Sequence, residues 1–443
     1  MTLVQSTQND KSHFLTAMEK ASTLPAPAWV KSIRENGAAR FAEMPLPSRR
    51  MEEWRFTNVN PILRTAFVSP TEPAVHGLSA SDVAPFLLGG SDWTTLVFVN
   101  GFYAPALSRS TVCEGVIAAN IAQALDTREA ELAPCLNAVL NGSGGVFGAL
   151  NSAFLIDGAY IRIEPGRKAT SPIHLVYITT RQECPAAHHP RNLIVAGRDS
   201  ESVVIESYVN LGGDAAYLNN VVTEAELQDG ARLQFYKVLH EAPNGYHLSA
   251  MKVRQHRDSN FKSFSIFLGG NIARNELSVL LDGEGAETLL NGLYLAQNEE
   301  LIDNYTHIEH AKPHCSSYIG YKGVLADKSH SVFTGKVFVR PHAQKTDSNQ
   351  LNQNLLLSDK ATADTKPQLE IYADDVKCTH GATIGQHEPQ QIYYFRTRGI
   401  AEDMARAMLT YGFADEVVRE LEVEPLRKYL EKSVFDRYSP IEA

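Results

Sequence analysis

The sequence predicts a mainly β protein in which a β-helix core lies between two α-helical regions. Short β-rich runs fill the chain from about residue 95 to residue 383, separated by Asp-Gly, Asp-Ser and Gly-Gly turn signals. Turns that begin with aspartate recur at Asp199, Asp229, Asp258, Asp282 and Asp327, with gaps of 30, 29, 24 and 45 residues. A loose period of about 20 to 30 residues, made of strands without intervening helices, is typical of a stacked solenoid.

Chain length and strand spacing disfavour the rival folds. At 443 residues the chain is too long for one ordinary compact core, whereas a repeat domain lengthens without needing a thicker core. No amphipathic segment long enough for a βαβ crossover lies between the strands, which argues against a Rossmann sheet. A β-sandwich requires shorter and more even spacing. We therefore predict a helical region and linker over 1–90, a β-helix core over 91–388 and a helical domain over 389–443.

Helical periodicity appears before and after the β-rich part. Trp29, Ile33, Gly37 and Phe41 recur every four residues, within a helical pattern from about Lys11 to Glu43. The C-terminal part has an apolar stripe of Met404, Met408, Phe413, Val417 and Leu421, and Pro425 opens a second helix. Both regions are interpreted as caps over the open ends of the solenoid, or the C-terminal pair is a docking surface for another subunit. The pattern alone leaves these two alternatives open.

Composition excludes several classes of protein. The net charge of −10, without a Lys/Arg block, argues against nucleic acid as a partner. No apolar run approaches the length that crosses a bilayer, and Met1–Lys11 lacks the pattern of a secretory signal. The five cysteines are odd in number and far apart, which indicates reduced thiols in a cytoplasmic location. No C-x-x-C pair offers a self-contained zinc or cluster site.

The segment from Lys366 to Gly385 holds the best candidate for chemistry. If it is extended, Asp374, Val376, Cys378 and His380 point to one face, with the α-carbons of Cys378 and His380 about 6.5 Å apart. A thiol and an imidazole so placed can reach one metal ion, but two ligands leave it unsaturated until a second chain contributes more. The alternative is that Cys378 is a small buried hydrophobe and His380 a hydrogen-bonded turn residue.

Two other histidine-bearing segments have no metal-site spacing. His307, His310, His314 and Cys315 are close in sequence, but Pro313 interrupts them, so we interpret the cluster as solenoid turn and surface. We interpret His188-His189-Pro190 as a loop.

The common enzyme motifs are absent. The sequence contains no G-x-x-x-x-G-K-[ST], G-x-S-x-G or G-x-G-x-x-G pattern, so the chain carries no P-loop of its own. The stretch 141–145 is interpreted as a flexible turn, because no strand–helix frame for a phosphate cradle is predicted around it. Asp374 and Asp375 could pair as the carboxylates of a β-helix carbohydrate-active enzyme, although adjacent strand residues face opposite ways.

Five blocks of this sequence resemble the SufB/SufD family of iron–sulfur cluster assembly proteins. They are Arg49–Thr57, Ala343–Asp347, Gln350–Ser358, Lys366–Thr383 and Arg396–Ile400, and the likeness runs from about residue 45 to about residue 425. The Cys-x-His-Gly-Ala-Thr block that begins at Cys378 is similar to the SufD branch, whereas the SufB branch would carry Glu-His-Glu-Ala there. Thr379 stands where the family often has serine. The first forty-odd residues match no strong block.

The resemblance implies a right-handed parallel β-helix and a complex of one SufB, one SufD and two copies of the ATPase SufC. The cores of SufB and SufD would pair, which places Asp374, Val376, Cys378 and His380 at their interface. His380, with Cys378 as a partner ligand, would then take part in iron acquisition or cluster assembly. The C-terminal domain, including Arg398, Gly399, Met404, Met408 and Phe413, would dock the ATPase.

The function expected from the resemblance is a non-catalytic scaffold that holds no tight cofactor alone and shares transient iron or an Fe–S cluster with SufB. One alternative is a SufB-like subunit that itself accepts sulfur and holds the cluster, which the few cysteines disfavour. Another is the carbohydrate-active β-helix enzyme. A homodimer through the same solenoid surface is a further alternative, because an unpaired strand edge tends to find a partner.

Overall fold

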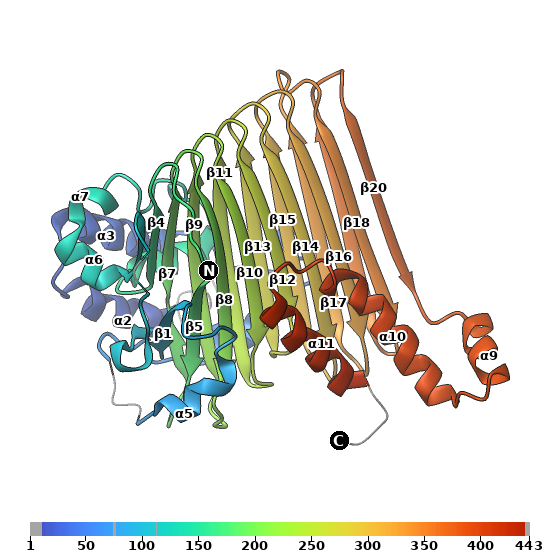
Figure 1. The fold of residues 1–443 in the computed structure, drawn as a ribbon. Helices are drawn as coiled ribbons and strands as arrows, with labels where there is room; N and C mark the ends of the chain where they lie inside the picture. The colour runs from blue at the N-terminus through green and yellow to red at the C-terminus, as the bar shows by residue number, and fades with distance from the viewer. Residues whose placement is uncertain (1–10, 74–76, 112, 439–443) are drawn as a thin grey trace.

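The computed structural model, which describes residues 11–73, 77–111 and 113–438, is an elongated solenoid of two facing sheets (Figure 1). Consecutive strands alternate between the two sheets from β7 onward, so each turn of the solenoid consists of two strands. The solenoid has about eight turns. Neighbouring strands within each sheet are parallel, except for the antiparallel pairs β1–β2 and β3–β4 at the N-terminal end. The prediction of a mainly β, parallel β-helix fold is therefore confirmed.

The first sheet runs from the N-terminal region to the last strand of the solenoid. Its strands, in spatial order, are β2 (Phe102–Tyr103), β1 (Thr94–Val99), β5 (Ile173–Thr179), β8 (Glu201–Asn210), β10 (Arg232–His240), β12 (Asn260–Phe267), β14 (Glu287–Ala296), β16 (Ser316–Leu325), β18 (Asp347–Leu356) and β20 (Lys377–Gly385).

The second sheet lies opposite the first and ends one strand earlier in the sequence. Its strands, in spatial order, are β3 (Val116–Asn120), β4 (Ala159–Ile163), β7 (Arg191–Ala196), β9 (Tyr217–Leu227), β11 (Gly245–Gln255), β13 (Ile272–Leu281), β15 (Leu301–His310), β17 (His330–Val339) and β19 (Thr362–Ile371). The short β6 (Ala186–His188) pairs with β9 beside this series.

The aspartate turns adopt backbone conformations that explain their residue types. Asp199, Asp258 and Asp327 have φ values of 53°, 53° and 54°, and Gly230 has a φ of 69°. This left-handed region is tolerated best by Gly, Asn and Asp, because other side chains clash with the backbone there. The recurring Asp positions thus mark the corners between strands.

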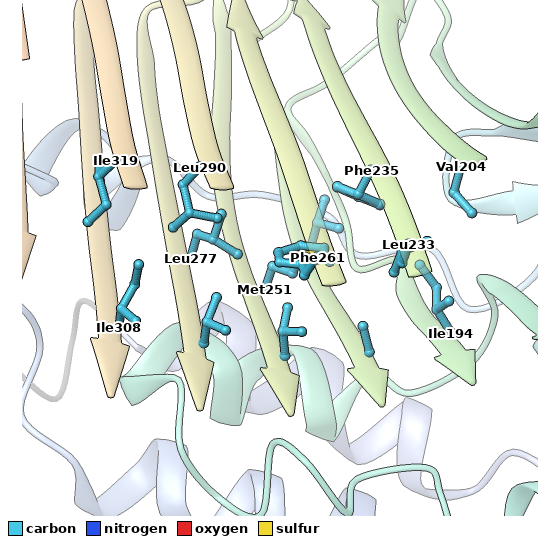
Figure 2. Packing of buried hydrophobic residues seen from close by; sticks show 14 of the residues in the cluster. Ile194, Val204, Leu233, Phe235, Met251, Phe261, Leu277, Leu290, Ile308 and Ile319 are labelled. Atoms are coloured by element: carbon cyan, nitrogen blue, oxygen red, sulfur yellow. The ribbon is translucent and has the colours of Figure 1, made fainter. Parts of the chain in front are cut away.

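Apolar side chains from both sheets fill the space between them. Figure 2 shows residues such as Leu233 and Phe261 from one sheet directed toward residues such as Met251 and Leu277 from the other. All four are almost completely buried. Because side chains alternate between the two faces of a strand, each strand contributes every second residue to this interior. We call this interior space the lumen, and residues directed into it are called inward.

The N-terminal helices cover the start of the solenoid and lie on the outer faces of both sheets. They are α2 (Ser12–Ser22), α3 (Ala28–Glu43), α4 (Asn60–Arg64) and α5 (Ala80–Val83), with short 3-10 turns η1 (Glu52–Trp54) and η2 (Ala84–Phe86), followed after β2 by η3 (Pro105–Leu107). The helical pattern predicted from Lys11 to Glu43 is thus two helices, broken near Pro25 and Pro27. Residues 1–10, which belong to the predicted N-terminal region, lie outside the described part.

The prediction of a helix-free region from about residue 95 was wrong near its start. Between β3 and β4 lie α6 (Ile121–Thr127), α7 (Glu129–Leu132) and α8 (Gly145–Ala153). The buried Glu224 carboxylate on β9 holds this insertion by accepting hydrogen bonds from the backbone N–H groups of Asn137, Val139 and Leu140. It also pairs with the buried Arg191 at 2.7 Å. The turn predicted at 141–145 leads directly into α8, which begins at Gly145.

The C-terminal helices are α9 (Pro389–Thr397), α10 (Glu402–Val418) and α11 (Glu424–Tyr438). The last two pack on the outer face of the first sheet, where Val417 and Leu430 join a cluster with Phe264 and Leu293. They therefore cover a flank of the solenoid and leave its C-terminal end open (Figure 1). The predicted apolar stripe is only partly right, because Met408 remains 46% exposed.

Candidate functional site

The solenoid ends in two strands that each have a neighbour on one side only. Among the described strands, β20 pairs with β18 and β19 pairs with β17, and each is the last strand of its sheet. Their outer backbone N–H and C=O groups form a template onto which another β-strand can add. We call this end, formed by β19 and β20, the open end.

Cys378 and His380 both point inward at the open end. In register they neighbour Ser348 and Gln350 of β18, which are almost fully buried on the inward face. Cys378 is half-buried and packs against the lumen core, whereas His380 is exposed. His380 is exposed because β20 is the last described strand of its sheet, so no further turn of the solenoid covers the inward side chains there. The alternative of a buried cysteine beside a turn histidine is wrong for His380, which lies on a strand, whereas Cys378 does pack against the core.

Val376 and Asp374 lie just before this strand. Val376 is half-buried against the same core as Cys378. Asp374 stands with Asp375 in a bend between β19 and β20, so the prediction of one extended face from Asp374 to His380 was wrong at its first residue. The Asp375 carboxylate is paired with Lys345, and Asp374 is exposed to solvent.

The electrostatic environment keeps the Cys378 side chain as a neutral thiol. Burial raises the pKa of Cys378, and the nearby Asp347 carboxylate raises it further. A metal ion binds the thiolate, so ligation must be strong enough to displace this proton. Over the described residues, no group of three or more His, Cys, Asp or Glu side chains is placed to hold a metal ion. Cys378 and His380 are thus two of the ligands that a complete site would need.

The segment from His307 to Cys315 divides between the lumen and the surface. His310 and Cys315 are buried in the lumen, so interpreting the whole cluster as turn and surface was wrong for them. His310 Nε2 lies 2.9 Å from Ser317 Oγ, which lies 2.8 Å from Ser348 Oγ. His314, with a φ of 59°, occupies the turn as expected. An alternating strand pattern through Ile302 and Ile308 is the sequence signal that places His310 inward.

His188 and His189 also differ from expectation. His188 ends β6 and both imidazoles are buried, His189 within 3.1 Å of Ser69 Oγ. Burial lowers the pKa of His188 to about 4 and that of His189 to about 3. Both are therefore neutral structural residues that connect β6 to the N-terminal region.

The residues predicted to dock an ATPase lie on and before α10. Arg398 and Gly399 end the α9 segment, where Gly399 has a φ of 83°. Met404 and Met408 line an apolar groove of about 400 Å³ between α10 and α11, together with Ala407, Tyr411, Val434, Phe435 and Tyr438. Phe413 instead packs against the sheet-side cluster, with the Lys322 ammonium 4.6 Å from its ring centre.

Sequence reasoning missed the apolar rim around Cys378 and His380. Ile371 and Tyr372 at the end of β19 and Ile384 on β20 are 38%, 59% and 47% exposed. Ile371 and Ile384 are inward positions by register with Val339 and Asn354. The sequence shows these residues as apolar positions that alternate along the final strands. They are exposed because the solenoid ends at these strands, which the alternation does not reveal.

Within the described ranges, no helix is both long and apolar enough to span a membrane.

Comparison with known proteins places the chain in one family along nearly its whole length. The model for the SufBD core domain of SUF-system FeS cluster assembly matches residues 177–413, and that for the SufBD N-terminal region matches residues 8–175. The iron–sulfur cluster assembly protein SufD of Escherichia coli (strain K12) is 34% identical over 387 residues, which cover 86% of this chain and 87% of that protein.

Two further relatives extend this likeness. A SufBD family protein of Synechocystis sp. is 30% identical over 90% of this chain and 89% of its own length. The SufD protein of Bacillus subtilis (strain 168) is 26% identical over 99% of both chains. The chain belongs to the SufB/SufD family of the SUF system for iron–sulfur cluster assembly.

Proposed function

We propose that this chain is a non-catalytic, SufD-like scaffold subunit that docks end to end with a SufB-like paralogue through its open end. The observation that carries the proposal is the coincidence of two free strand edges, an apolar rim and an incomplete pair of metal ligands at one place. Strand addition would supply backbone hydrogen bonds, and the rim of Ile371, Tyr372 and Ile384 would supply apolar contact.

Iron, or a nascent Fe–S cluster, is the cargo of this interface. His380 is the primary iron ligand from this chain, with Cys378 as its neighbour two positions away. Soft thiolate and imidazole ligands suit iron and Fe–S clusters. The partner contributes the remaining ligands, and the chain holds no cluster tightly by itself. Iron is thus a transient substrate that is released with the assembled cluster.

The energy for assembly comes from a SufC-like ATPase that docks on the C-terminal helices. Support comes from the groove between α10 and α11, where Met408 and Phe435 are 46% and 52% exposed. Exposed methionine and aromatic side chains around a groove are typical of a surface that receives a partner. Met404 lines this groove, Arg398 and Gly399 lie in the turn between α9 and α10, and Phe413 would act by fixing α10 on the sheet. We infer a cytoplasmic location from the dispersed, unpaired cysteines.

Reconstitution with the two proposed partners tests this function. Cluster formation should fall strongly with His380→Ala, while the complex should still assemble, because His380 is exposed and contributes little to the fold of this chain. Thr379→Ala is the matched control, since Thr379 is an exposed neighbour on the same strand that faces outward. Wild-type rate and yield with His380→Ala would refute the ligand role.

A second experiment separates the scaffold from its alternatives. Co-purification and mass measurement should give a complex with a SufB-like chain and an ATPase. Persulfide mapped onto this chain's own cysteines would favour a SufB-like role instead. Cleavage of a glycan would favour the carbohydrate enzyme, and a stable pair of identical chains would show that the open end accepts a second copy.

A further inference from the structure

The last turns of the lumen contain polar side chains with no protein partner. Within the described residues, both amide atoms of Asn304 and of Gln350 are buried without a hydrogen bond. The Thr365 hydroxyl is in the same condition. The Tyr321 hydroxyl makes no hydrogen bond of ordinary geometry, and Ser265 is the side chain that lies near enough to interact with it. Asn304, Tyr321 and Gln350 are at most 1% exposed as whole residues. Buried amides and hydroxyls are nearly always satisfied, by protein or by ordered water.

All four side chains point into the lumen. Asn304 lies on β15 between Ile302 and Ile308, which both belong to the lumen core. Thr365 on β19 is two residues from Pro367 and four from Leu369, which packs on that core. Tyr321 is itself a core residue of β16, and Gln350 on β18 alternates with Asn352, whose amide donates to the Tyr294 hydroxyl. Alternation along each strand thus assigns every one of them to the inside.

Their order along the solenoid axis leads to the open end. Asn304 is separated from Thr365 by one residue of the same row, Phe333 of β17. Tyr321 precedes Asn352 and Ala382 in the neighbouring row of the first sheet. Gln350 is the direct register neighbour of His380. Parallel strands are about 4.8 Å apart, so bulk water at the exposed His380 and Ala382 lies one strand from the Gln350 amide.

The inner end of this series meets side chains that are already satisfied. Asn275, the register neighbour of Asn304 on β13, accepts a hydrogen bond from the Ser249 hydroxyl at 3.1 Å. Lys237 reaches the same amide oxygen at 3.5 Å and pairs with Glu206 at 3.4 Å. The unpartnered amides of Asn304 and Gln350 thus lie between this satisfied network and the open end. Two inward atoms farther from that end, Ser202 Oγ and His247 Nε2, also lack a partner.

We propose that the lumen of these turns binds a short file of water molecules, which runs from Asn304 past Tyr321 and Gln350 to the open end beside His380. Each water satisfies two or more of the amide and hydroxyl groups that the protein leaves unpaired. The apolar residues around them, such as Ile319 and Phe333, confine the file to one polar track.

The role of this file rests on the proposed function, whereas its existence does not. When a partner covers the open end, the outward route from His380 to solvent closes. The file inside the lumen then holds a few water molecules against the inward side of Cys378 and His380. These molecules can take or give up a position on the iron as its ligands are exchanged, without the two subunits separating.

A crystal structure of the full chain at high resolution, together with a water ¹⁷O relaxation count of long-lived buried waters, tests the file directly. We expect ordered waters within hydrogen-bond distance of the Asn304 and Gln350 amides. Asn304→Leu and Gln350→Met should each reduce the count without raising Tm. Asn352→Leu is the matched control, because its amide is bonded to Tyr294 and to the Tyr321 carbonyl. It should lower Tm whether or not the lumen holds water.

A dry lumen, with Tm raised by both Asn304→Leu and Gln350→Met, would overturn the proposal, because removing an unsatisfied buried amide is stabilising. In the reconstituted complex, Gln350→Met should slow cluster formation while the complex still assembles. An unchanged rate would overturn the role in exchange. If His380→Ala leaves the rate of cluster formation unchanged, this result counts against the proposed function alone, and the number of buried waters still tests the file.

Discussion

The open end offers a sharp test of subunit docking through Ile384. This residue lies on the inward face of β20 and is 47% exposed, near the C-terminal end of the strand, whereas the exposed Ile371 and Tyr372 lie beside its N-terminal end. Complete burial of an isoleucine side chain contributes about 1.5–3 kcal/mol. Since about half of Ile384 is still exposed, docking would bury the rest for about 0.7–1.4 kcal/mol. Ile384→Asp removes this contribution and places a carboxylate where the partner must exclude water.

The carboxylate is the larger effect. Desolvating an unpaired charge costs several kcal/mol, so the total loss in binding should be at least about 3 kcal/mol. That loss corresponds to a Kd raised more than about 100-fold. The chain itself should lose only about 1 kcal/mol of folding stability, because the site is already half in water.

Titration calorimetry between the purified chain and the SufB-like partner measures this Kd, and urea unfolding verifies that the variant is folded. Thr379→Asp is the control, since Thr379 is exposed on the opposite face of the same strand. It should change the Kd by less than about threefold, which is below 1 kcal/mol. If Ile384→Asp binds as tightly as the wild type, the partner does not use the open end and the reasoning fails.

Three further predictions concern the groove, the N-terminal insertion and pH. Met408→Glu should abolish co-purification with the ATPase and leave Tm unchanged, because Met408 is 46% exposed; retained binding would exclude the groove. Glu224→Gln should lower the free energy of unfolding in urea by about 3–5 kcal/mol, because it leaves the buried Arg191 without its charged partner. Glu114→Gln, at an exposed pair, should change the same free energy by less than about 0.5 kcal/mol, and equal effects of the two variants would contradict the prediction. Burial lowers the pKa of His174 and of His189 to about 3. Between about pH 6.5 and pH 3 these two histidines are therefore protonated in the unfolded chain but neutral in the folded chain. Stability should therefore fall as pH drops from 6.5 toward 3, by about 1.4 kcal/mol per pH unit and histidine. The fall should be shallower in His174→Asn, and a urea midpoint that falls in this variant as steeply as in the wild type would contradict the prediction.

The fold was predictable because its signals are local and repeated. Asp199, Asp258 and Asp327 mark turns that need a left-handed backbone, and the β-rich runs between them supply the strands. The insertion α6–α8 was not predictable from the period, because contacts that are remote in sequence hold it, among them the buried carboxylate of Glu224 and the apolar packing on β4 and β7. Nothing in the local pattern reports such a long-range contact.

The candidate site was predictable in its residues but less so in its surroundings. The spacing of Cys378 and His380 fixed their common face once the segment was a strand. Asp374 left that face because the chain bends before β20. His310 and Cys315 looked like surface residues because a polar side chain in a lumen cannot be told from one in water by periodicity alone. The exposure of His380 depends on where the solenoid stops, which only the structure shows.

The position of iron in crystals of the complete complex tests the central claim most directly. Anomalous scattering at the iron edge should locate the metal at the open end, bonded to a ring nitrogen of His380 and to at least one side chain of the partner subunit. Iron held entirely by one subunit, or lying away from β20, would contradict the account.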